Sequence, residues 1–387
     1  MPHWKDIFIR SATFIEDQWD DLRFALMKKL GLNDPVQVVT YRTYGTATNL
    51  YVKGRVLEDK KISAAGDKDT ILNNLLNMYK RFESDEIPGA RLKVELPGEE
   101  HFVMSDKEGY FVLNLAPVTP IINQQLWHPV TLQLVAAPVP FTPGLQVIAE
   151  VMIPPPDAEY GIISDIDDTI VKTGATNLLA MSRATFLNNA KTRLPFAGVA
   201  EFYKALQLSR NGKRNNPFFY VSSSPWNLYD LLKEFLDLNG ITAGPLLLRD
   251  FGLENDSFSG KGHMGHKLKE ITQILQAYPH LNFILIGDSG QEDPAIYKQV
   301  VKNFPGRILA IYIRDVQLPE RRKLALEFSE TLKELKVEMI IVENTVNAAE
   351  HAAERGFIFN QAISTIEQDK MKDEGLLPGK EEATVTS

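Results

Sequence analysis

The stretch that decides the fold is Tyr160-Gly161-Ile162-Ile163-Ser164-Asp165-Ile166-Asp167-Asp168-Thr169-Ile170, in which an apolar run ends in three aspartates and a threonine. The apolar half is typical of a buried strand in a parallel sheet, because such strands are covered on both faces. Aspartate is almost never buried without a partner, so carboxylates at this position need a metal ion, a lysine or both. The segment therefore predicts a metal-dependent phosphoryl-transfer site.

The sequence after residue 156 alternates apolar strands with helical segments. Such alternation predicts an α/β domain built on a doubly wound parallel sheet, whose ligands bind at the carboxyl ends of the strands. Residues 177–189 lie in an unusually long connection and are expected to form a small helical cap. The expected strands are 161–164, 218–221, 245–248, 283–286, 308–313 and 337–342, and the expected helices include 225–238, 265–278 and 319–335.

The sequence before residue 156 has a different pattern. Short apolar runs with a two-residue alternation, such as 36–42 and 90–96, predict antiparallel strands, and residues 69–81 predict one helix. Three consecutive prolines at 154–156 then predict a stiff linker. The expected organisation is an N-terminal, mainly-β sandwich domain over 1–155 with one helical insertion, a catalytic domain over 156–366, and a polar, disordered tail over 367–387.

Composition narrows the classes of function. A net charge of -8 over 387 residues argues against a dedicated nucleic-acid surface. The absence of cysteine excludes disulfides, zinc-thiolate sites and cysteine nucleophiles. No apolar run approaches the length of about 18 residues that a transmembrane helix needs, and the N-terminus lacks the pattern of a secretory signal. The expected location is the cytoplasm.

Asp165 and Asp167 offer two carboxylates with distinct roles. In phosphoryl transfer through a covalent intermediate, one carboxylate attacks phosphorus and a second handles the proton of the leaving group. We predict Asp165 as the nucleophile and Asp167 as the acid/base. A solvated acidic turn or an isolated calcium site is the alternative for this segment taken alone.

Two further strand ends carry polar residues. Ser222, followed by Ser223, is expected to bind a phosphoryl oxygen together with nearby backbone N–H groups, although Ser224 before Pro225 is also typical of a helix cap. Asp288 ends another apolar strand and, with Asp165, would suffice to bind Mg2+, which keeps several waters. Asp293 before Pro294 has either a supporting role there or a helix-capping role.

A lysine is expected to neutralise the phosphoryl group and the carboxylates. Of the lysines between 260 and 271, Lys267 is preferred over Lys261 and Lys269, because its spacing to Ile271 and Ile274 places it near the packed face of a helix. A solvated basic loop is the alternative. His263 and His266 are interpreted as loop or helix-cap residues rather than metal ligands.

Taken in order, Asp165-Ile166-Asp167-Asp168-Thr169, Ser222, Lys267 and Gly287-Asp288 with Asp293 resemble the four motifs of the haloacid dehalogenase superfamily of phosphohydrolases. The resemblance implies that Asp165 forms an aspartyl-phosphate and that Asp167 protonates the leaving group and later activates water. It also implies that Mg2+ is bound by Asp165, Asp288 and the backbone carbonyl of Asp167. Ser222, Ser223 and Lys267 would hold the phosphoryl oxygens, with Thr169 and Asp293 in supporting positions.

The segments 161–170, 220–226, 248–252 and 286–294 look like the signatures of one branch, the fungal actin-patch phosphatidate phosphatase family, which is related to lipins, and its bacterial relatives. This resemblance covers roughly residues 160–356, and the N-terminal domain also looks like the one that precedes the catalytic domain in bacterial members. It implies hydrolysis of phosphatidate to diacylglycerol and phosphate, a phospholipid substrate, and peripheral contact with a membrane.

Two other functions remain open at this point. A phosphatase of the same type would act on soluble phosphomonoesters or phosphoproteins, and a phospholipid-binding module would lack turnover, although its expected mark, loss of the nucleophile, is not seen at Asp165. A rim of basic residues is a candidate for membrane approach, with solvated surface charges as the alternative. Its members are Lys261, Lys269, Arg314, Arg321, Arg322 and Lys323. Arg249 and Asp250 either border the substrate or form an internal ion pair.

Overall fold

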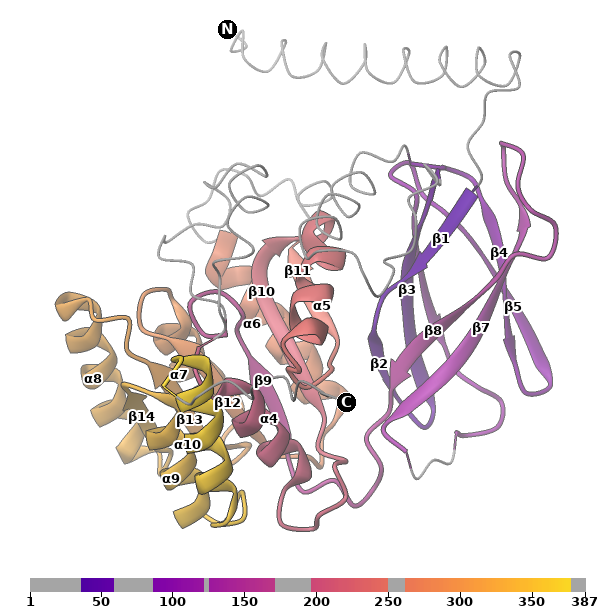
Figure 1. Cartoon of the computed structure of the whole chain (residues 1–387). Helices are drawn as coiled ribbons and strands as arrows, with labels where there is room; N and C mark the ends of the chain where they lie inside the picture. Colours follow the sequence, from indigo (N-terminus) through magenta and orange to yellow (C-terminus); the bar gives the residue numbers. More distant parts are fainter. Residues whose placement is uncertain (1–35, 59–85, 122–124, 171–195, 250–261, 377–387) are drawn as a thin grey trace, which may run out of the picture.

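The computed structural model describes residues 36–58, 86–121, 125–170, 196–249 and 262–376 (Figure 1). The helix predicted at 69–81 and the cap predicted at 177–189 lie outside the described residues. Asp250, Lys261 and the side chain of His263 lie outside them as well. The described part contains a mainly-β region at 36–152, called the N-terminal β region below, and a mixed α/β part after it.

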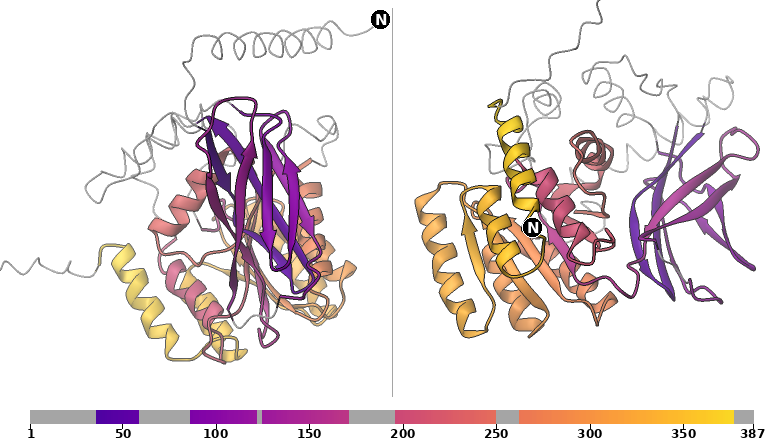
Figure 2. Two further views of the ribbon diagram at one scale, coloured as in Figure 1. Left: turned by 90° about the vertical axis from the view of Figure 1, so that its right-hand side faces the viewer. Right: turned by 60° about the horizontal axis from the view of Figure 1, so that its bottom comes forward.

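The N-terminal β region is one curled sheet with the strand order β1-β3-β2-β8-β7-β4-β5, and β6 pairs with β3. Its pairs are antiparallel except for β2 with β8. Val52 and Val56 on β3 share a buried core with Leu92 on β4 and Leu132 on β7, so the two halves of the sheet face each other (Figure 2). The strands are β1 (Val36–Thr40), β2 (Thr43–Thr46), β3 (Asn49–Glu58), β4 (Arg91–Leu96), β5 (Glu99–Met104), β6 (Tyr110–Leu115), β7 (Trp127–Ala136) and β8 (Gln146–Met152).

The α/β part contains a six-stranded sheet in which every pair is parallel, with the order β11-β10-β9-β12-β13-β14. The predicted mixed α/β domain with a parallel sheet is therefore confirmed. Sequence order runs one way from β9 to β11 and the other way from β12 to β14, so the reversal lies between β9 and β12. The strands are β9 (Gly161–Ser164), β10 (Phe218–Pro225), β11 (Leu246–Arg249), β12 (Phe283–Asp288), β13 (Ile308–Arg314) and β14 (Met339–Val342).

Helices cover both faces of the parallel sheet (Figure 1). Ile162 packs in a core with α4, α5, α9 and α10, whereas its neighbour Ile163 packs in a second core with α6, α7 and α8. Alternate residues of a strand point to opposite faces, which is why neighbouring strand residues such as Ile162 and Ile163 are both apolar. The helices are α4 (Val199–Leu208), α5 (Tyr229–Leu238), α6 (Gly262–Ala277), α7 (Asp293–Asn303), α8 (Pro319–Glu334), α9 (Thr345–Glu354) and α10 (Ala362–Asp373), and η1 (Trp226–Leu228) precedes α5.

Residues 367–373 were predicted to belong to a disordered tail, but they form the second half of α10. Ile366 is completely buried in the core that α10 shares with α4 and α9. The carboxylate of Asp373 accepts a hydrogen bond from the backbone N–H of Gly198, 2.9 Å away, at the start of α4. Ile366 and Asp373 therefore attach α10 to the rest of the domain, although the segment is polar at most other positions.

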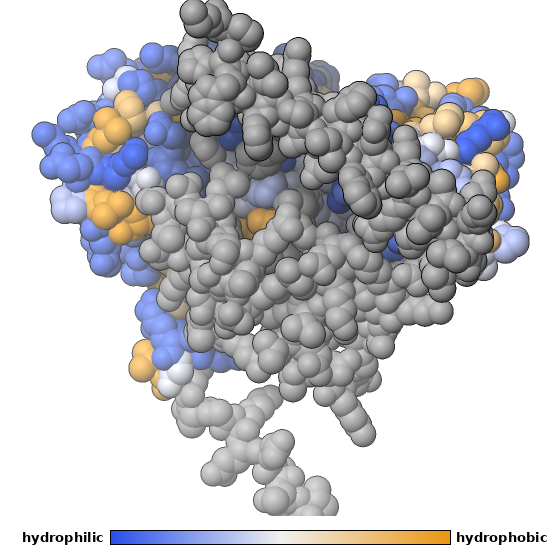
Figure 3. All heavy atoms as spheres, turned by 90° about the horizontal axis from the view of Figure 1, so that it is seen from above, coloured by the Kyte–Doolittle hydropathy of each residue, from blue (hydrophilic) through white to orange (hydrophobic). Residues whose placement is uncertain are grey.

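Seen from above, the described residues that remain visible are mainly hydrophilic, with hydrophobic residues in small groups between them (Figure 3). Among the described helices, none combines the length and hydrophobicity that crossing a bilayer requires.

Gly161 provides a test of how tightly β9 packs. A Cβ atom at this position would lie 2.4 Å from a ring carbon of Phe283, which is completely buried on the neighbouring strand β12. We expect Gly161→Ala to lower the free energy of unfolding by about 1–3 kcal/mol, because a packed ring has little room to move. Urea denaturation would measure the change.

Gly265→Ala is the matched control, since a Cβ at that exposed position of α6 meets no atom of the described residues within 4 Å. Alanine is the better helix former, so this variant should be neutral or more stable by up to about 1 kcal/mol. Equal effects of the two substitutions would contradict the packing argument.

Candidate active site

The site lies where the order of the parallel strands reverses. Asp165 directly follows β9, and Asp288 is the last residue of β12, the strand next to it. The backbone N–H of Asp165 donates to the carbonyl of Ile286, 2.9 Å away, so the sheet fixes the start of the loop. Strand ends at such a reversal diverge into a crevice, which is where open parallel sheets bind ligands.

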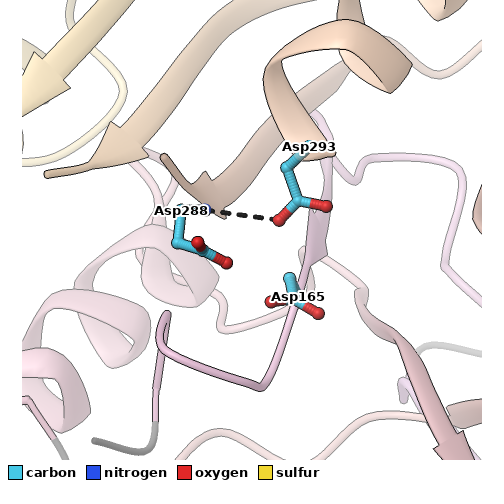
Figure 4. Close-up of side chains that lie close together, drawn as sticks. All are labelled: Asp165, Asp288 and Asp293. Carbon is cyan, nitrogen blue, oxygen red and sulfur yellow. Dashed lines mark hydrogen bonds between the residues drawn. The ribbon is translucent and has the colours of Figure 1, made fainter. Parts of the chain in front are cut away.

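Three buried carboxylates meet there. Asp165, Asp288 and Asp293 each contribute an oxygen atom, and these atoms lie within 4.8 Å of one another (Figure 4). No more than 1% of any of the three residues is exposed. Like charges at this separation repel strongly when water is excluded, so the arrangement requires cations.

Lys267 provides the first cation. Its Nζ atom lies 2.9 Å from Asp165 Oδ1 and 2.6 Å from Asp293 Oδ1, and the residue is 3% exposed. Burial alone would lower the pKa of Lys267, but the three carboxylates outweigh it and hold the pKa above its usual value. The lysine therefore stays charged, and it lies on the packed side of α6 as the spacing to Ile271 and Ile274 predicts.

Asp293 reaches the cluster because Gly287 has no side chain. A Cβ at Gly287 would lie 2.5 Å from Asp293 Oδ2, in the space that the carboxylate occupies. That oxygen accepts a hydrogen bond of 3.3 Å from the backbone N–H of Asp288 (Figure 4). Asp293 is the first residue of α7, but its carboxylate binds Lys267 and the end of β12. It lies where a supporting residue would orient the lysine.

Asp167 lies in a separate environment. Its Oδ2 atom accepts hydrogen bonds from the hydroxyls of Ser222 at 3.0 Å and Ser224 at 3.2 Å. Burial raises the pKa of Asp167 to about 6, although Lys267 and the two hydroxyls oppose the rise. The next residue, Asp168, has a left-handed backbone with φ of 53°, which turns the loop sharply after Asp167. Asp165 and Asp167 thus have different partners and different proton affinities.

The donor set fits a hard divalent cation. Asp288 Oδ1 accepts the backbone N–H groups of Gly290 at 2.6 Å and Gln291 at 3.0 Å. Asp288 Oδ2 and Asp167 Oδ1 are buried and have no hydrogen-bond partner among the described residues. Burial and the neighbouring Asp293 raise the pKa of Asp288 to about 7. Buried oxygen atoms without a donor need a positive charge, and oxygen ligands alone suit Mg2+ or a similar ion.

The residues predicted from the sequence lie together in the structure. Ser222, which was predicted to bind a phosphoryl oxygen, donates its hydroxyl to Asp167. Asp293 adds a third carboxylate to those of Asp165 and Asp288, and the backbone carbonyl of Asp167 lies 3.5 Å from Gln291 Nε2. Thr169 donates to Asp165 Oδ2 at 3.4 Å, and Ser223 is buried between the two serines that bind Asp167.

Three residues near the site were not predicted to belong to it. Ser224 and Gln291 contact Asp167. The position of Ser224 at the same strand end as Ser222 was the one feature of the sequence that could have indicated its role. Arg314 was assigned to a basic surface rim, but it is 9% exposed, pairs in register with Asp288 and stacks 3.9 Å from the ring centroid of Phe196. Arg314 is the last residue of β13, an apolar strand in the interior of the sheet, and it is buried like the residues before it.

A cavity of about 1130 Å3 lies elsewhere, between the N-terminal β region and the parallel sheet. Tyr44, Lys53, Trp226 and Tyr278 are among its lining residues, and the three clustered aspartates are not. Its size alone indicates no chemistry, whereas the aspartate cluster has charge, burial and unsatisfied oxygen atoms. His266, next to Lys267, also lines this cavity and is buried 3.9 Å from Glu270.

Comparison with solved structures adds little. A carbohydrate acetylesterase from Xanthomonas citri matches with a TM-score of 0.23 and 9% identity, over 77% of this chain and 75% of that chain. A likeness this weak supports no conclusion about fold or function.

Comparison with curated sequences is more informative. Phosphatidate phosphatase APP1 of Saccharomyces cerevisiae is 37% identical over 155 residues, and an uncharacterized protein of Schizosaccharomyces pombe is 30% identical over 167 residues. Each match covers 40% of this chain and 25% of the relative, so the chain spans about a quarter of the length of either. Residues 160–315 also match the family model of the phosphatidate phosphatase APP1 catalytic domain. Residues 160–315 of this chain are therefore similar to the phosphatidate phosphatase APP1 catalytic domain, both in the family model and in the yeast relative.

Proposed function

We propose that this chain is a Mg2+-dependent phosphatase that hydrolyses phosphatidate to diacylglycerol and phosphate through an aspartyl-phosphate intermediate. The observation that carries the proposal is the division of the site into two carboxylate environments. Asp165 is paired with Lys267 in the acidic cluster, and Asp167 is held by two hydroxyls beside it. The domain would be a haloacid dehalogenase-like one, and because α10 packs on α4 it would extend at least to residue 373.

In the first step a carboxylate oxygen of Asp165 attacks phosphorus, and the bond between phosphorus and the ester oxygen breaks. The protonated Asp167 donates its proton to that oxygen, so diacylglycerol leaves as a neutral alcohol. Lys267 offsets the negative charge of the phosphoryl group. Bound Mg2+ would supply further charge neutralisation, held by Asp165, Asp288 and the carbonyl of Asp167.

In the second step Asp167, now a carboxylate, takes a proton from water as the water oxygen attacks phosphorus. The bond between phosphorus and Asp165 breaks, which releases phosphate and restores both carboxyl groups. A pKa raised to about 6 suits this double role, because such a group gains and loses a proton readily near neutral pH.

Asp165→Asn should abolish Mg2+-dependent release of phosphate from phosphatidate vesicles, by about 10^3-fold or more, because the amide is a poor nucleophile. Asp106→Asn is the matched control, since Asp106 lies in a hairpin turn of the N-terminal β region and its Oδ1 accepts backbone N–H groups that an amide oxygen also accepts. Wild-type turnover by Asp165→Asn would show that the nucleophile is misassigned.

The substrate is tested with the wild-type protein by comparing phosphatidate vesicles with soluble phosphomonoesters at equal concentration, with and without a chelator. The proposal predicts faster release from the vesicles and loss of release with the chelator. Faster hydrolysis of the soluble esters would indicate a soluble-substrate phosphatase, and vesicle binding without release would indicate a lipid-binding module.

Asp288→Asn should make the metal-free protein more stable at pH 7.5, by roughly 1 kcal/mol or about 2–4 °C in Tm. The folded pKa of about 7 exceeds the ordinary value near 3.8, so the cost of this carboxyl to stability grows as the pH rises from about 4 to about 7, is complete above pH 7 and disappears in acid. The amide oxygen can still accept the N–H groups of Gly290 and Gln291.

Thermal unfolding with and without Mg2+ measures this effect. We expect Mg2+ to raise the Tm of the wild-type protein and to have little effect on Asp288→Asn, whose activity should also need far more Mg2+. An unchanged Mg2+ titration in the variant would remove Asp288 from the metal site.

A further inference from the structure

The serines that bind Asp167 lie in an irregular part of β10, where the strand departs from its pairing with β11. Along β10 and β11 the paired residues are Val221 with Leu247 and then Pro225 with Arg249, so the register slips between them. Ser222 to Ser224 therefore bulge out of the ladder, which frees their hydroxyls for Asp167. Their position depends on how firmly the chain is anchored at the two ends of the bulge.

The near end of the bulge is anchored by the sheet, and the far end is anchored by Trp226. The ring of Trp226 stacks on Tyr41, with a centroid separation of 5.1 Å and an interplanar angle of 22°. The ammonium of Lys53 lies 3.6 Å from the Trp226 ring centroid, and Lys53 is only 7% exposed. A cation over an indole is most strongly attracted when both groups are shielded from water. Tyr41 and Lys53 both come from the N-terminal β region, whereas a further stacked ring, that of Tyr229, lies on α5 at a centroid separation of 6.0 Å.

The N-terminal β region also binds α5, the helix that follows Trp226. The backbone N–H of Arg42 donates to the hydroxyl of Tyr229 at 2.6 Å, and the Arg42 guanidinium binds both carboxylate oxygens of Asp237 at 2.7 and 3.2 Å. The rings of Tyr41 and Tyr229 lie 4.2 Å apart. The connection between β1 and β2 therefore holds η1 and both ends of α5, so Trp226 cannot shift without breaking contacts between the two parts of the chain.

We propose that Tyr41 and Lys53 are positioning residues for Asp167. They fix Trp226, Trp226 fixes the far end of the Ser222–Ser224 bulge, and the bulge holds the carboxyl group that donates the proton. The inference rests on the proposed function, because it needs Asp167 to protonate the leaving group. It assigns the N-terminal β region a part in catalysis without contact with the substrate.

The dependence of the rate on the leaving group distinguishes this role from a merely structural one. An alkyl phosphate such as glycerol 2-phosphate releases a strongly basic oxygen and needs a proton from Asp167. The nitrophenolate of p-nitrophenyl phosphate is weakly basic and leaves without one. Misplacing Asp167 therefore slows the first substrate more than the second, whereas general damage to the fold slows both equally.

The test uses the full chain with Lys53→Met and, as a second variant, Tyr41→Leu. The quantity compared is kcat/KM, which reports formation of the aspartyl-phosphate and leaves out the later attack of water that also uses Asp167. We expect kcat/KM for glycerol 2-phosphate to fall by about tenfold or more, part of the 10^2- to 10^4-fold contribution of a general acid. We expect kcat/KM for p-nitrophenyl phosphate to change by less than about threefold. Lys53→Arg keeps a cation and Tyr41→Phe keeps a ring, so both should restore the alkyl rate.

Lys93→Met is the matched control, because Lys93 lies on β4 and pairs only with Glu95 and Glu100 among the ion pairs of the described residues. It should leave both rates unchanged. Equal losses on the two substrates in both test variants, or no loss on either, would overturn the positioning role. Asp167→Asn tests the proposed function separately: if it lowers neither rate, Asp167 is not the acid, and the failure lies in the proposed function.

Discussion

The structure depends on a buried group of aspartates whose negative charge a single lysine, Lys267, does not neutralise. Lys267 is buried between Asp165 and Asp293, and Asp288 and Asp167 lie beside them with oxygen atoms that no described donor satisfies. The described residues at the centre therefore carry more negative than positive charge in a place that excludes water. Such an arrangement is unfavourable for folding and favourable for binding a cation and a phosphoryl group, a conflict that is common at functional sites.

The fold holds this unfavourable arrangement together by surrounding it with apolar cores. β9 and β12 are covered on both faces, so the backbone that carries Asp165 and Asp288 cannot move apart to relieve their repulsion. Gly287 contributes by leaving room for Asp293, and the left-handed turn at Asp168 separates Asp167 from the cluster. The same rigidity explains how two neighbouring aspartates keep different partners.

The sequence was sufficient to predict the parallel sheet and the residues that gather at its edge, because unbroken apolar strands that end in acids leave few other arrangements. Lys267 could be chosen among three lysines because helical spacing ties it to Ile271 and Ile274. Contacts that depend on a bulge or on a distant segment were not predictable in this way. Ser224 binds Asp167 only because the register slips after Val221, and Arg314 is buried only because its strand lies inside the sheet. The helix α10 was missed because a single buried position, Ile366, anchors a polar segment.

The residues that match the family model are fewer than the residues that pack together around the parallel sheet. The match ends at residue 315, yet β14, α9 and α10 come later and fill one face of the sheet with Val342, Ala349 and Ile366. At the other end, Trp226 and Tyr229 depend on rings and cations that precede the match. The stretch that matches the family is thus enclosed by parts of the chain that lie outside the match and supply its apolar cover. A fragment cut at the limits of sequence similarity would expose the interior on two sides.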